Sequence, residues 1–312
     1  MALERTIAML SAVILVASGC EPQPDPTGLA TPEAPMLSLH PGHGWSPAIS
    51  LDPGGTVGLN TPALEGCPAE GPDGLSLFLA SNRDGQIDIW VSRRPSRNSA
   101  WGAPEKLPAP VNSSSNDFCP TPLPGGDLLF VSNRPGGCGS GTADIYQTHH
   151  HPTRGWAEPE HLGCEVNSAG NEFSPSYVGA GGGLLFFSSD RAGQDNIYMS
   201  TRMPQGAWGA PVAVDELNAP GFSTARPNVS ADGREIVFDS NRPGGLGGPD
   251  LWTATRRSVL EPWSDPTNLG PNVNSGSAET RPWLSRDGKR LFFGSNRPGS
   301  EGSLDLFVST RR

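Results

Sequence analysis

Short apolar runs alternate with polar and glycine-rich segments along most of this chain, and the same arrangement recurs five times. In each copy an apolar run ends in Ser-Asn-Arg or Ser-Asp-Arg, a connection containing glycine follows, and a second run of the type Asp-Ile-Trp comes next. The five copies begin at Leu77, Leu128, Leu185, Ile236 and Leu291. Their arginines recur every 51 to 57 residues, a period typical of one supersecondary unit repeated in an array.

Each repeat is expected to contain four short strands. A segment that ends in a turn precedes the apolar run, and a tryptophan follows the second run with an apolar residue six positions further on, as in Trp101 and Leu107. Short strands separated by Gly, Asp and Pro predict an antiparallel meander. Both faces of the strands are apolar or aromatic, as in Leu306-Phe307-Val308, so each sheet needs a neighbour on either side. A radial arrangement provides those neighbours.

The two ends of the chain indicate that the array closes into a ring. The repeat tryptophans lie at 101, 156, 208 and 263, so the next would fall beyond the last residue, whereas Trp45 lies upstream of the first repeat. The chain therefore begins with a fourth strand and stops after a third. We predict an all-β fold over residues 45–312, a five-bladed β-propeller of four-stranded antiparallel blades. The N-terminal strand around Trp45 would pair with the strand around Phe307 and leave no unpaired edge.

Composition and charge narrow the functional classes. The chain contains Gly 40 and Pro 33, which suits many turns, and aromatic residues at 7% suit a packed core better than disorder. The formal net charge is −10 and the sequence has no basic stripe, which argues against nucleic-acid binding. We interpret the acidity as a source of solubility, with cation binding as the alternative.

The first residues have the pattern of an export signal. The apolar run over residues 7–17 is too short to span a membrane, and it leads through small residues to Cys20. Small residues ending in a cysteine resemble a bacterial lipobox, which implies a signal peptide at 1–19 and a lipid on Cys20. Ala17 stands where leucine is usual, so an ordinary signal peptide with an unmodified Cys20 is the alternative.

Residues 20–44 are rich in proline and poor in apolar side chains, so they are expected to form an extended tether rather than a folded unit. At about 3.1 Å per residue, such a tether holds the folded part tens of ångströms from a bilayer. If the cell sorts lipoproteins by an aspartate after the lipidated cysteine, Glu21 favours the outer membrane. The expected location is the bacterial cell envelope, with the propeller facing the periplasm or the cell surface.

A second repeated pattern places acids and arginines at one end of each meander. An acid at the start of the first strand follows a repeated asparagine by five residues, as Glu65 follows Asn60. This acid, the arginine after the second strand and an aspartate at the start of the third strand should lie close together. An arginine fork can bridge two carboxylates, so we interpret the set as structural ion pairs; a ring of charges that binds a cation or polar ligand is the alternative. The fourth unit departs from the pattern, because Ser223 lies five residues after Asn218 and one residue is inserted. The set comprises Glu65, Arg83, Asp88, Asp117, Arg134, Asp144, Glu172, Arg191, Arg242, Asp250, Glu279, Arg297 and Asp305.

Four cysteines fall within the propeller, in an exported and therefore oxidising setting. Cys138 and Cys164 interrupt two connections of the second unit, and we predict a disulfide between them. Cys67 and Cys119 occupy equivalent places in adjacent units and can pair only if the strands approach within about 7 Å. Zinc is disfavoured because no Cys-x-x-Cys spacing occurs.

The remaining candidates for chemistry are histidines and aromatic residues. The cluster at residues 149–151 is three adjacent histidines, which point in different directions in extended chain and are expected in a solvated turn rather than around a metal. No Gly-x-Ser-x-Gly elbow marks a nucleophile, and the acids recur with the repeat, unlike the isolated carboxylates of a glycosidase. We therefore assign no catalytic residue, metal or cofactor. Tyr177 and Trp283 are first-strand aromatics that we propose as a ligand platform, with core filling as the alternative.

The repeats resemble the PD40 or WD40-like β-propeller repeats found in the C-terminal domain of TolB and in many bacterial envelope proteins. The resemblance rests on the Ser-Asn-Arg runs with their following Asp-Ile-Trp strands and covers residues 45–312. TolB's own propeller has six blades and an additional N-terminal domain, so its particular partners are not carried over.

The repeat motifs are specific for the fold and not for a function, so our preferred hypothesis draws on the chain as a whole: a non-catalytic, lipid-anchored scaffold that binds an envelope protein or a peptidoglycan component. Such a protein is expected to contact the membrane through its lipid only, to bind no nucleic acid and to be a monomer. The alternative is a carbohydrate-binding or carbohydrate-active propeller with its site at the mouth of the central channel.

Overall fold

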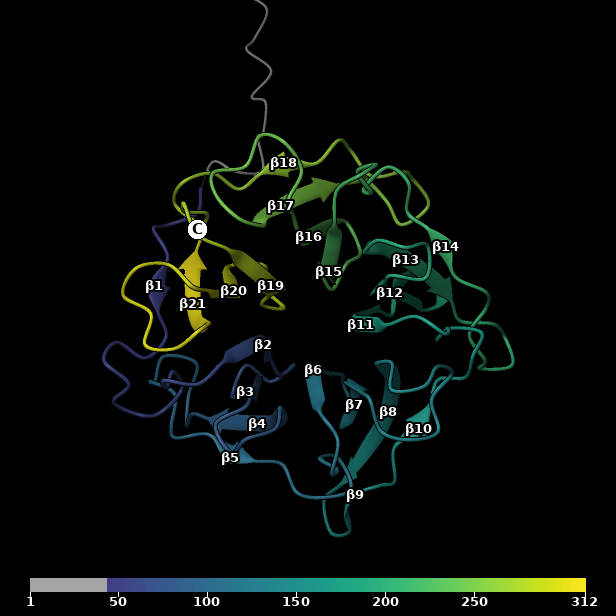
Figure 1. Cartoon of the computed structure of the whole chain (residues 1–312), viewed down its shortest axis with the longest axis horizontal. Helices are drawn as coiled ribbons and strands as arrows, with labels where there is room; N and C mark the ends of the chain where they lie inside the picture. The colour runs from purple at the N-terminus through teal and green to yellow at the C-terminus, as the bar shows by residue number, and fades with distance from the viewer. Residues whose placement is uncertain (1–43) are drawn as a thin grey trace, which may run out of the picture. The chain divides into compact units, whose positions relative to one another are not determined.

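The computed structural model describes residues 44–312, which form five small antiparallel sheets around a central axis (Figure 1). The fold is a five-bladed β-propeller, as predicted. In each blade the first strand lies nearest the axis and the following strands lie progressively further out. The signal peptide at 1–19, the lipidation of Cys20 and nearly all of the tether are predictions that lie outside the described residues. Within residues 44–312, no helix has the length and apolar character that crossing a membrane requires.

Each blade contains three long strands and a short outer one. Blade 1 consists of β2 (Glu65–Glu70), β3 (Ser76–Ser81), β4 (Asp88–Arg93) and β5 (Glu105–Lys106). Blade 2 consists of β6 (Asp117–Pro122), β7 (Asp127–Ser132), β8 (Asp144–His151) and β10 (Glu160–His161), with β9 (Gly155–Trp156) paired to the end of β8. Blade 3 consists of β11 (Glu172–Val178), β12 (Leu184–Ser189), β13 (Asn196–Thr201) and β14 (Val212–Ala213), with the short 3-10 turn η1 (Ala180–Gly182) before β12. Blade 4 consists of β15 (Thr224–Val229), β16 (Glu235–Ser240), β17 (Asp250–Thr255) and β18 (Thr267–Asn268). Blade 5 consists of β19 (Glu279–Leu284), β20 (Arg290–Ser295), β21 (Asp305–Thr310) and the N-terminal β1 (Ile49–Ser50).

The ring closes where the two ends of the described chain meet. Strand β1 pairs antiparallel with β21, with Ile49 opposite Val308 and Ser50 opposite Phe307. Trp45 is 2% exposed and packs in the same apolar cluster as Phe307. The predicted closure of the last blade by the N-terminal strand is therefore confirmed, and it pairs the outer edge of β21.

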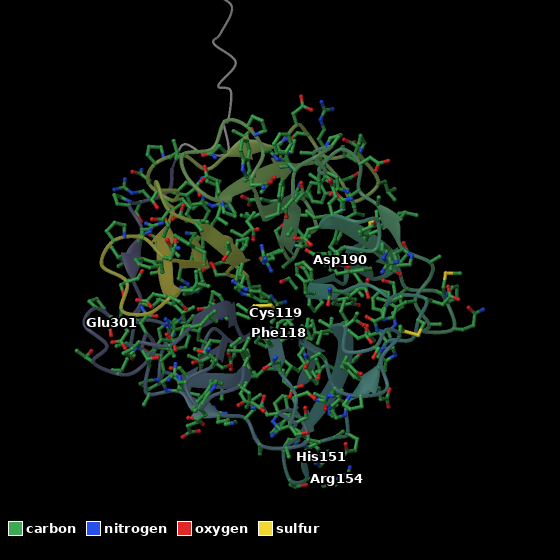
Figure 2. All side chains as sticks on the ribbon, viewed as in Figure 1. Phe118, Cys119, His151, Arg154, Asp190 and Glu301 are labelled. Carbon is green, nitrogen blue, oxygen red and sulfur yellow. A yellow bond between two sulfur atoms is a disulfide. The ribbon has the colours of Figure 1, made fainter. Side chains whose placement is uncertain are left out.

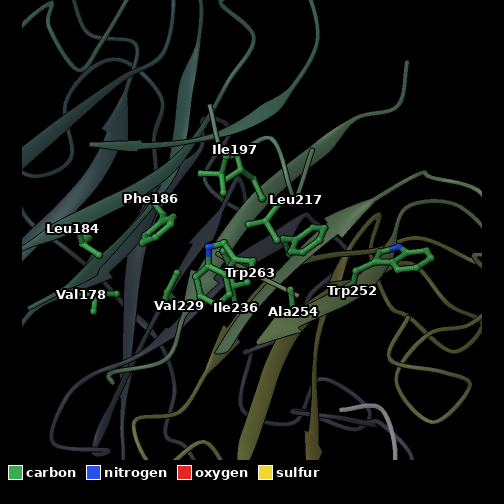
Figure 3. Close-up of a cluster of buried hydrophobic side chains, with 12 residues drawn as sticks. Val178, Leu184, Phe186, Ile197, Leu217, Val229, Ile236, Trp252, Ala254 and Trp263 are labelled. Atoms are coloured by element: carbon green, nitrogen blue, oxygen red, sulfur yellow. The ribbon is translucent and has the colours of Figure 1, made fainter. Parts of the chain in front are cut away.

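Apolar clusters between neighbouring blades form the core. The cluster between blades 3 and 4 (Figure 3) joins Leu184, Phe186 and Ile197 of one blade to Ile236 and Trp263 of the next. Phe186 and Trp263 meet edge to face, with ring centroids 6.1 Å apart. Because each sheet buries both faces against its neighbours, strands with apolar residues on both faces are stable only in the closed ring.

The repeated asparagine completes the outer edge of each blade. Asn112 accepts a hydrogen bond from the amide of Ile89 at 2.8 Å and donates to the carbonyl of the same residue at 2.9 Å. Asn274 makes the same pair of bonds to Leu251. An asparagine amide has the same donor and acceptor as a peptide group, so it extends the ladder beyond a two-residue outer strand.

All five inner strands contain a bulge at their third residue. The residues at this position are Cys67, Cys119, Ser174, Arg226 and Arg281; each has a φ between 46° and 56° and each precedes a proline. A non-glycine residue in the left-handed region is uncommon, and five in equivalent places mark a feature of the fold. The strand registers shift at these points. The bulge brings the five side chains to the axis, where they line one cavity.

The three histidines are accessible to solvent, as predicted, but they do not lie in a turn. They form the last part of β8, because β9 pairs with this end of the strand and prolongs the ladder. Nδ1 of His149 lies 2.7 Å from Oδ1 of Asp127, and the ring of His150 packs edge-on against Trp156 with centroids 4.9 Å apart. The three side chains thus have different neighbours, as expected for consecutive residues of a strand.

Candidate functional site

The alternating strand directions give the propeller two faces. The inner strands begin on what we call the lower face and end on the upper face. The connections between second and third strands, and those between blades, therefore lie on the lower face. The connections between first and second strands, and between third and fourth, lie on the upper face.

On the lower face, the first-strand acid pairs with the repeat arginine in four of the five blades. The pairs are Glu65–Arg83 at 3.2 Å, Asp117–Arg134 at 2.7 Å, Glu172–Arg191 at 3.0 Å and Glu279–Arg297 at 3.1 Å. Each carboxylate is completely buried, and each also accepts bonds from the amide and hydroxyl of a Ser or Thr four residues earlier. These acids are saturated by internal donors, which favours a structural role over a ligand-binding ring.

The third-strand aspartates do not join these pairs. The prediction that each repeat arginine bridges two carboxylates is therefore wrong. Asp144 accepts the amide of Cys138 at 2.8 Å, and Asp305 accepts the amide of Glu301 at 2.6 Å. Asp250 accepts the amide of Leu246 in the same way. Asp88 instead lies 2.5 Å from Nζ of Lys106. The other guanidinium contacts of each arginine go to the serine that ends the second strand and to a backbone carbonyl of the preceding connection.

Blade 4 keeps the arginine without the acid. Thr224, and not Ser223 as the sequence spacing suggested, pairs with Ser240 in the register that the acids occupy elsewhere. Nη2 of Arg242 donates to the hydroxyl of Thr224 at 3.1 Å. Burial without a carboxylate partner lowers the pKa of Arg242 to about 10.

The central channel is filled at the level of the bulges. Cys67 and Cys119 form a disulfide with Cα atoms 4.8 Å apart, which settles a pairing that the sequence left open, and Figure 2 shows Cys119 at the centre of the ring. Nη1 of Arg226 lies 2.6 Å from Oδ2 of Asp239. Burial raises the pKa of Asp239, with the neighbouring arginines opposing it, and lowers that of Arg281 to about 10. The remaining cavity is about 20 Å³, room for a single water.

The upper mouth of the channel holds a pocket of about 270 Å³ that side chains from all five blades line. Tyr177 and Trp283, the predicted ligand platform, both line it and are both half-buried. Tyr177 also packs edge-on against Trp208, with ring centroids 6.1 Å apart, and Trp283 packs against the apolar cluster between blades 1 and 5. Each aromatic side chain therefore contributes both to the core and to the pocket wall. Pro72, Pro122 and Pro124 add rigid apolar surface.

A single carboxylate lines this pocket, and two arginines hold it. Oε1 of Glu70 lies 2.7 Å from Nη2 of Arg94, and Oε2 lies 3.0 Å from Nη2 of Arg290. The Glu70 side chain is 3% exposed. The pKa of Arg94 is lowered by burial, which the charge of Glu70 opposes. Both oxygens of Glu70 are thus bound by arginines. Arg286, which is exposed, adds a positive charge at the rim of the pocket.

Blade 2 contains the second disulfide and a possible ligand cluster beside it. Cys138 and Cys164 form a disulfide with Cα atoms 5.7 Å apart. Nε2 of His161 lies 3.1 Å from Oδ2 of Asp144 and 3.8 Å from Sγ of Cys138. A disulfide sulfur cannot supply the thiolate that metal ions bind, so in the oxidised protein these groups support the hairpin rather than a metal.

Several of these residues were missed from the sequence. Arg226 and Arg281 stand where the repeat has Cys67, Cys119 and Ser174, so aligning the third residue of each first strand would have revealed two channel arginines. In the clamp on Glu70, Arg94 occupies a repeated position and stacks on Trp101 as Arg256 stacks on Trp263, but its contact with Glu70 and the bond from the distant Arg290 follow no repeat.

The comparisons with known proteins establish the fold. No family model and no curated protein matches the chain. Among solved structures, an α-L-arabinofuranosidase from Lactobacillus brevis aligns with a TM-score of 0.56 and 13% identity over 80% of this chain and 90% of the other. The catalytic domain of the Coprinopsis cinerea GH62 α-L-arabinofuranosidase aligns with a TM-score of 0.56 and 14% identity over 86% and 96%. A structure assigned to TolB from Agrobacterium tumefaciens aligns with a TM-score of 0.49 and 18% identity over 80% and 84%. The similarity to the two α-L-arabinofuranosidase structures shows a shared fold and nothing beyond it.

Proposed function

We propose that this protein is a non-catalytic, lipid-anchored β-propeller of the bacterial cell envelope that acts as a scaffold for a protein or a peptidoglycan component. The observation that carries the proposal is the upper pocket, a concave surface framed by Tyr177, Trp283 and three prolines. Aromatic and proline side chains present large, rigid contact areas at low entropic cost, which suits binding.

The acid chemistry of the pocket supports a binding role over catalysis. Glycoside hydrolysis ordinarily uses two carboxyl groups on either side of the scissile bond, roughly 5–10 Å apart. The lining of this pocket contributes Glu70 alone, and both of its oxygens are already bound by arginines. A carboxylate whose two oxygens are both bound by guanidinium groups is poorly placed to act as a general acid, because a general acid must lie within hydrogen-bond reach of the substrate oxygen that it protonates.

Two features support the envelope location. The sequence before residue 20 has the pattern of a lipoprotein signal, and the described chain contains two disulfides, Cys67–Cys119 and Cys138–Cys164. Disulfides persist in oxidising compartments outside the cytosol.

Site-specific photo-crosslinking tests the binding role. A photoreactive phenylalanine analogue replaces Trp283 in the lipidated protein, and Val212, 56% exposed on an outer strand, is the matched control position. Crosslinking to a defined protein or peptidoglycan fragment from position 283 but not from position 212 is expected. Equal crosslinking from both positions, or recovery of a soluble sugar alone, would contradict the proposal.

The second candidate is a carbohydrate-binding or carbohydrate-active propeller. The paired aromatic side chains of the pocket favour it, because sugar rings stack on aromatic faces, and two structures of similar fold are α-L-arabinofuranosidases. Arabino-oligosaccharides are the direct probe. Hydrolysis by the wild-type protein that Glu70→Gln abolishes would establish this candidate and remove the scaffold proposal.

The anchor is tested separately. Cys20→Ala should release the protein from envelopes washed with salt and carbonate, because a single cysteine would carry the lipid. A variant that stays membrane-bound through both washes would show that the anchor proposal is wrong.

A further inference from the structure

The upper rim of blades 3 to 5 carries a local excess of positive charge. Three segments make up this rim: residues 202–211 between β13 and β14, residues 256–266 between β17 and β18, and the two chain ends beside β21, residues 311–312 and 44–48. Together they contain five arginines and two acids, Glu261 and Asp265, in a chain whose net charge is −10. A local cluster of positive charges on an acidic protein favours the binding of an anionic partner at this rim over a role of these charges in solubility alone.

Three of the rim arginines face solvent. Arg202, Arg257 and Arg312 are exposed, and none of them takes part in the ion pairs found among residues 44–312. The other two are committed to the fold: Arg256 stacks on Trp263 at 4.1 Å, and Arg311 binds Glu235 at 2.6 Å. Arg202 also lies over the ring of Trp208 at 5.6 Å, but all three residues are exposed, so their charges can reach a partner.

Two exposed apolar side chains project from the same rim. Leu260 is 92% exposed and Met203 is 47% exposed. Val259 packs against the buried cluster between blades 3 and 4 and so fixes the loop, which directs the neighbouring Leu260 outward. Leu260 lies three residues after Arg257, and Met203 directly follows Arg202. Apolar tips flanked by arginines are the arrangement with which peripheral proteins enter the headgroup region of a bilayer.

The described chain begins at this rim as well. The amide of Ser46 donates to the carbonyl of Thr310 at 2.7 Å, at the upper end of β21, and Trp45 lies beneath Arg311 at 4.6 Å. The segment that leads back to Cys20 therefore joins the propeller where the arginines and apolar tips are found.

We propose that the rim of blades 3 to 5 docks on an anionic phospholipid surface, with the three exposed arginines at the headgroups and Leu260 and Met203 inserted between them. The inference deepens the proposed function, on which it rests for the lipid anchor, and it adds a second membrane contact to the lipid alone.

The shape of the rim favours a membrane over an acidic protein. Met203 and Leu260 line neither the upper pocket nor the channel cavity, so they are projections rather than parts of a concave site. A projecting side chain needs a partner that deforms around it, as lipid headgroups do, whereas a protein partner would need complementary hollows for loops on separate blades.

Vesicle sedimentation tests the proposal. The protein used is the mature chain from residue 20 with Cys20→Ser, so that no covalently attached lipid contributes to binding. The protein should bind vesicles of phosphatidylglycerol and phosphatidylethanolamine and should not bind phosphatidylcholine vesicles. The pair Arg202→Glu and Arg257→Glu should weaken partitioning by roughly tenfold or more at about 0.1 M salt. The matched pair Arg97→Glu and Arg154→Glu makes the same charge change on the rim of blades 1 and 2, where Figure 2 shows Arg154, and should leave partitioning within about twofold.

A second arm tests the apolar contact. Leu260→Ser should lower the binding that remains at about 0.5 M salt, where charge is screened. Leu246→Ser, at a residue 51% exposed on the lower face, should not. Melting curves of every variant accompany the binding measurements, because Arg202 stacks on Trp208 and Arg97 donates to the carbonyl of Asp73. The proposal is overturned by absent vesicle binding, by equal effects of the two arginine pairs, or by equal effects of the two leucine changes. None of these outcomes depends on the Cys20 anchor, which has its own test.

Discussion

Replacing Glu279 by Gln tests whether the buried ion pairs of the lower face stabilise the blades. Glu279 is completely buried. Its Oε2 accepts the amide of Ser275 at 2.8 Å, and its Oε1 accepts the hydroxyls of Ser275 and Ser295 and Nη2 of Arg297. A glutamine keeps the shape but removes the charge, and its amide group presents donors where the protein already supplies donors. Arg297 then loses its only carboxylate partner within the described chain.

The expected cost follows from these contacts. Removing one partner of a buried ion pair costs about 3–5 kcal/mol. The Arg297 side chain is 15% exposed and retains the carbonyl of Val273 at 2.6 Å, so the lower end of that range applies and we expect a loss of about 3 kcal/mol. For a domain of this size the melting temperature should fall by about 6–12 °C. Thr224→Val, which removes the neutral counterpart in blade 4, should cost only about 1 kcal/mol.

A double-mutant cycle with Arg297→Met isolates the pair from the loss of other contacts. Urea unfolding followed by tryptophan fluorescence gives the four free energies, and we expect a coupling of about 2 kcal/mol. Arg93 and Glu105 serve as the surface control: they lie 3.1 Å apart with side chains 63% and 77% exposed, and should couple by less than about 1 kcal/mol. A coupling between Glu279 and Arg297 no larger than that of the surface pair would refute the stabilising role.

Three further predictions concern other parts of the ring. Burial raises the pKa of Asp52, but hydrogen bonds from backbone amides outweigh it and hold the pKa below the ordinary 3.8. Asp52→Asn should therefore cost about 1–2 kcal/mol at neutral pH, and the deficit, measured by urea unfolding at several pH values, should shrink as the pH falls below 3.8. Cys138→Ser with Cys164→Ser should lower stability by about 3.5 kcal/mol, because the disulfide closes a loop of 26 residues; reduction of the wild type, which also opens Cys67–Cys119, should lower stability further. Trp45→Ala, at a side chain 2% exposed, should cost about 3–5 kcal/mol by calorimetry and more than Trp283→Ala, whose side chain is half-buried; the reverse order would contradict the closure.

The fold was predictable because its determinants are local and repeated. Strand-length apolar runs, the turns between them and the tryptophan spacing are set by neighbouring residues, and five copies average out the departures of any one copy. The mismatch between the two chain ends was enough to predict that β1 would pair with β21. The same regularity indicated that acids and arginines share the lower face.

The partners within each cluster were less predictable. The sequence placed Asp144 and Asp305 beside the repeat arginines, but their oxygens accept backbone amides of the preceding connection instead. Cys67 and Cys119 pair because the ring brings neighbouring inner strands to 4.8 Å between Cα atoms, a distance that depends on how many blades share the axis. In blade 4, Thr224 can replace the acid of the other blades because its hydroxyl still accepts a hydrogen bond from Arg242.

The sequence by itself determined the blades, their number and the way the ring closes, since these follow from the order of short segments along the chain. Only the tertiary structure decided what meets at the axis and at the rim. The clamp on Glu70, the pocket of Tyr177 and Trp283, and the rim with Arg202 and Arg257 all join residues from different blades. Contacts between blades depend on the radius and tilt of the ring, which are collective results of packing every sheet against its neighbours, so no single repeat encodes them.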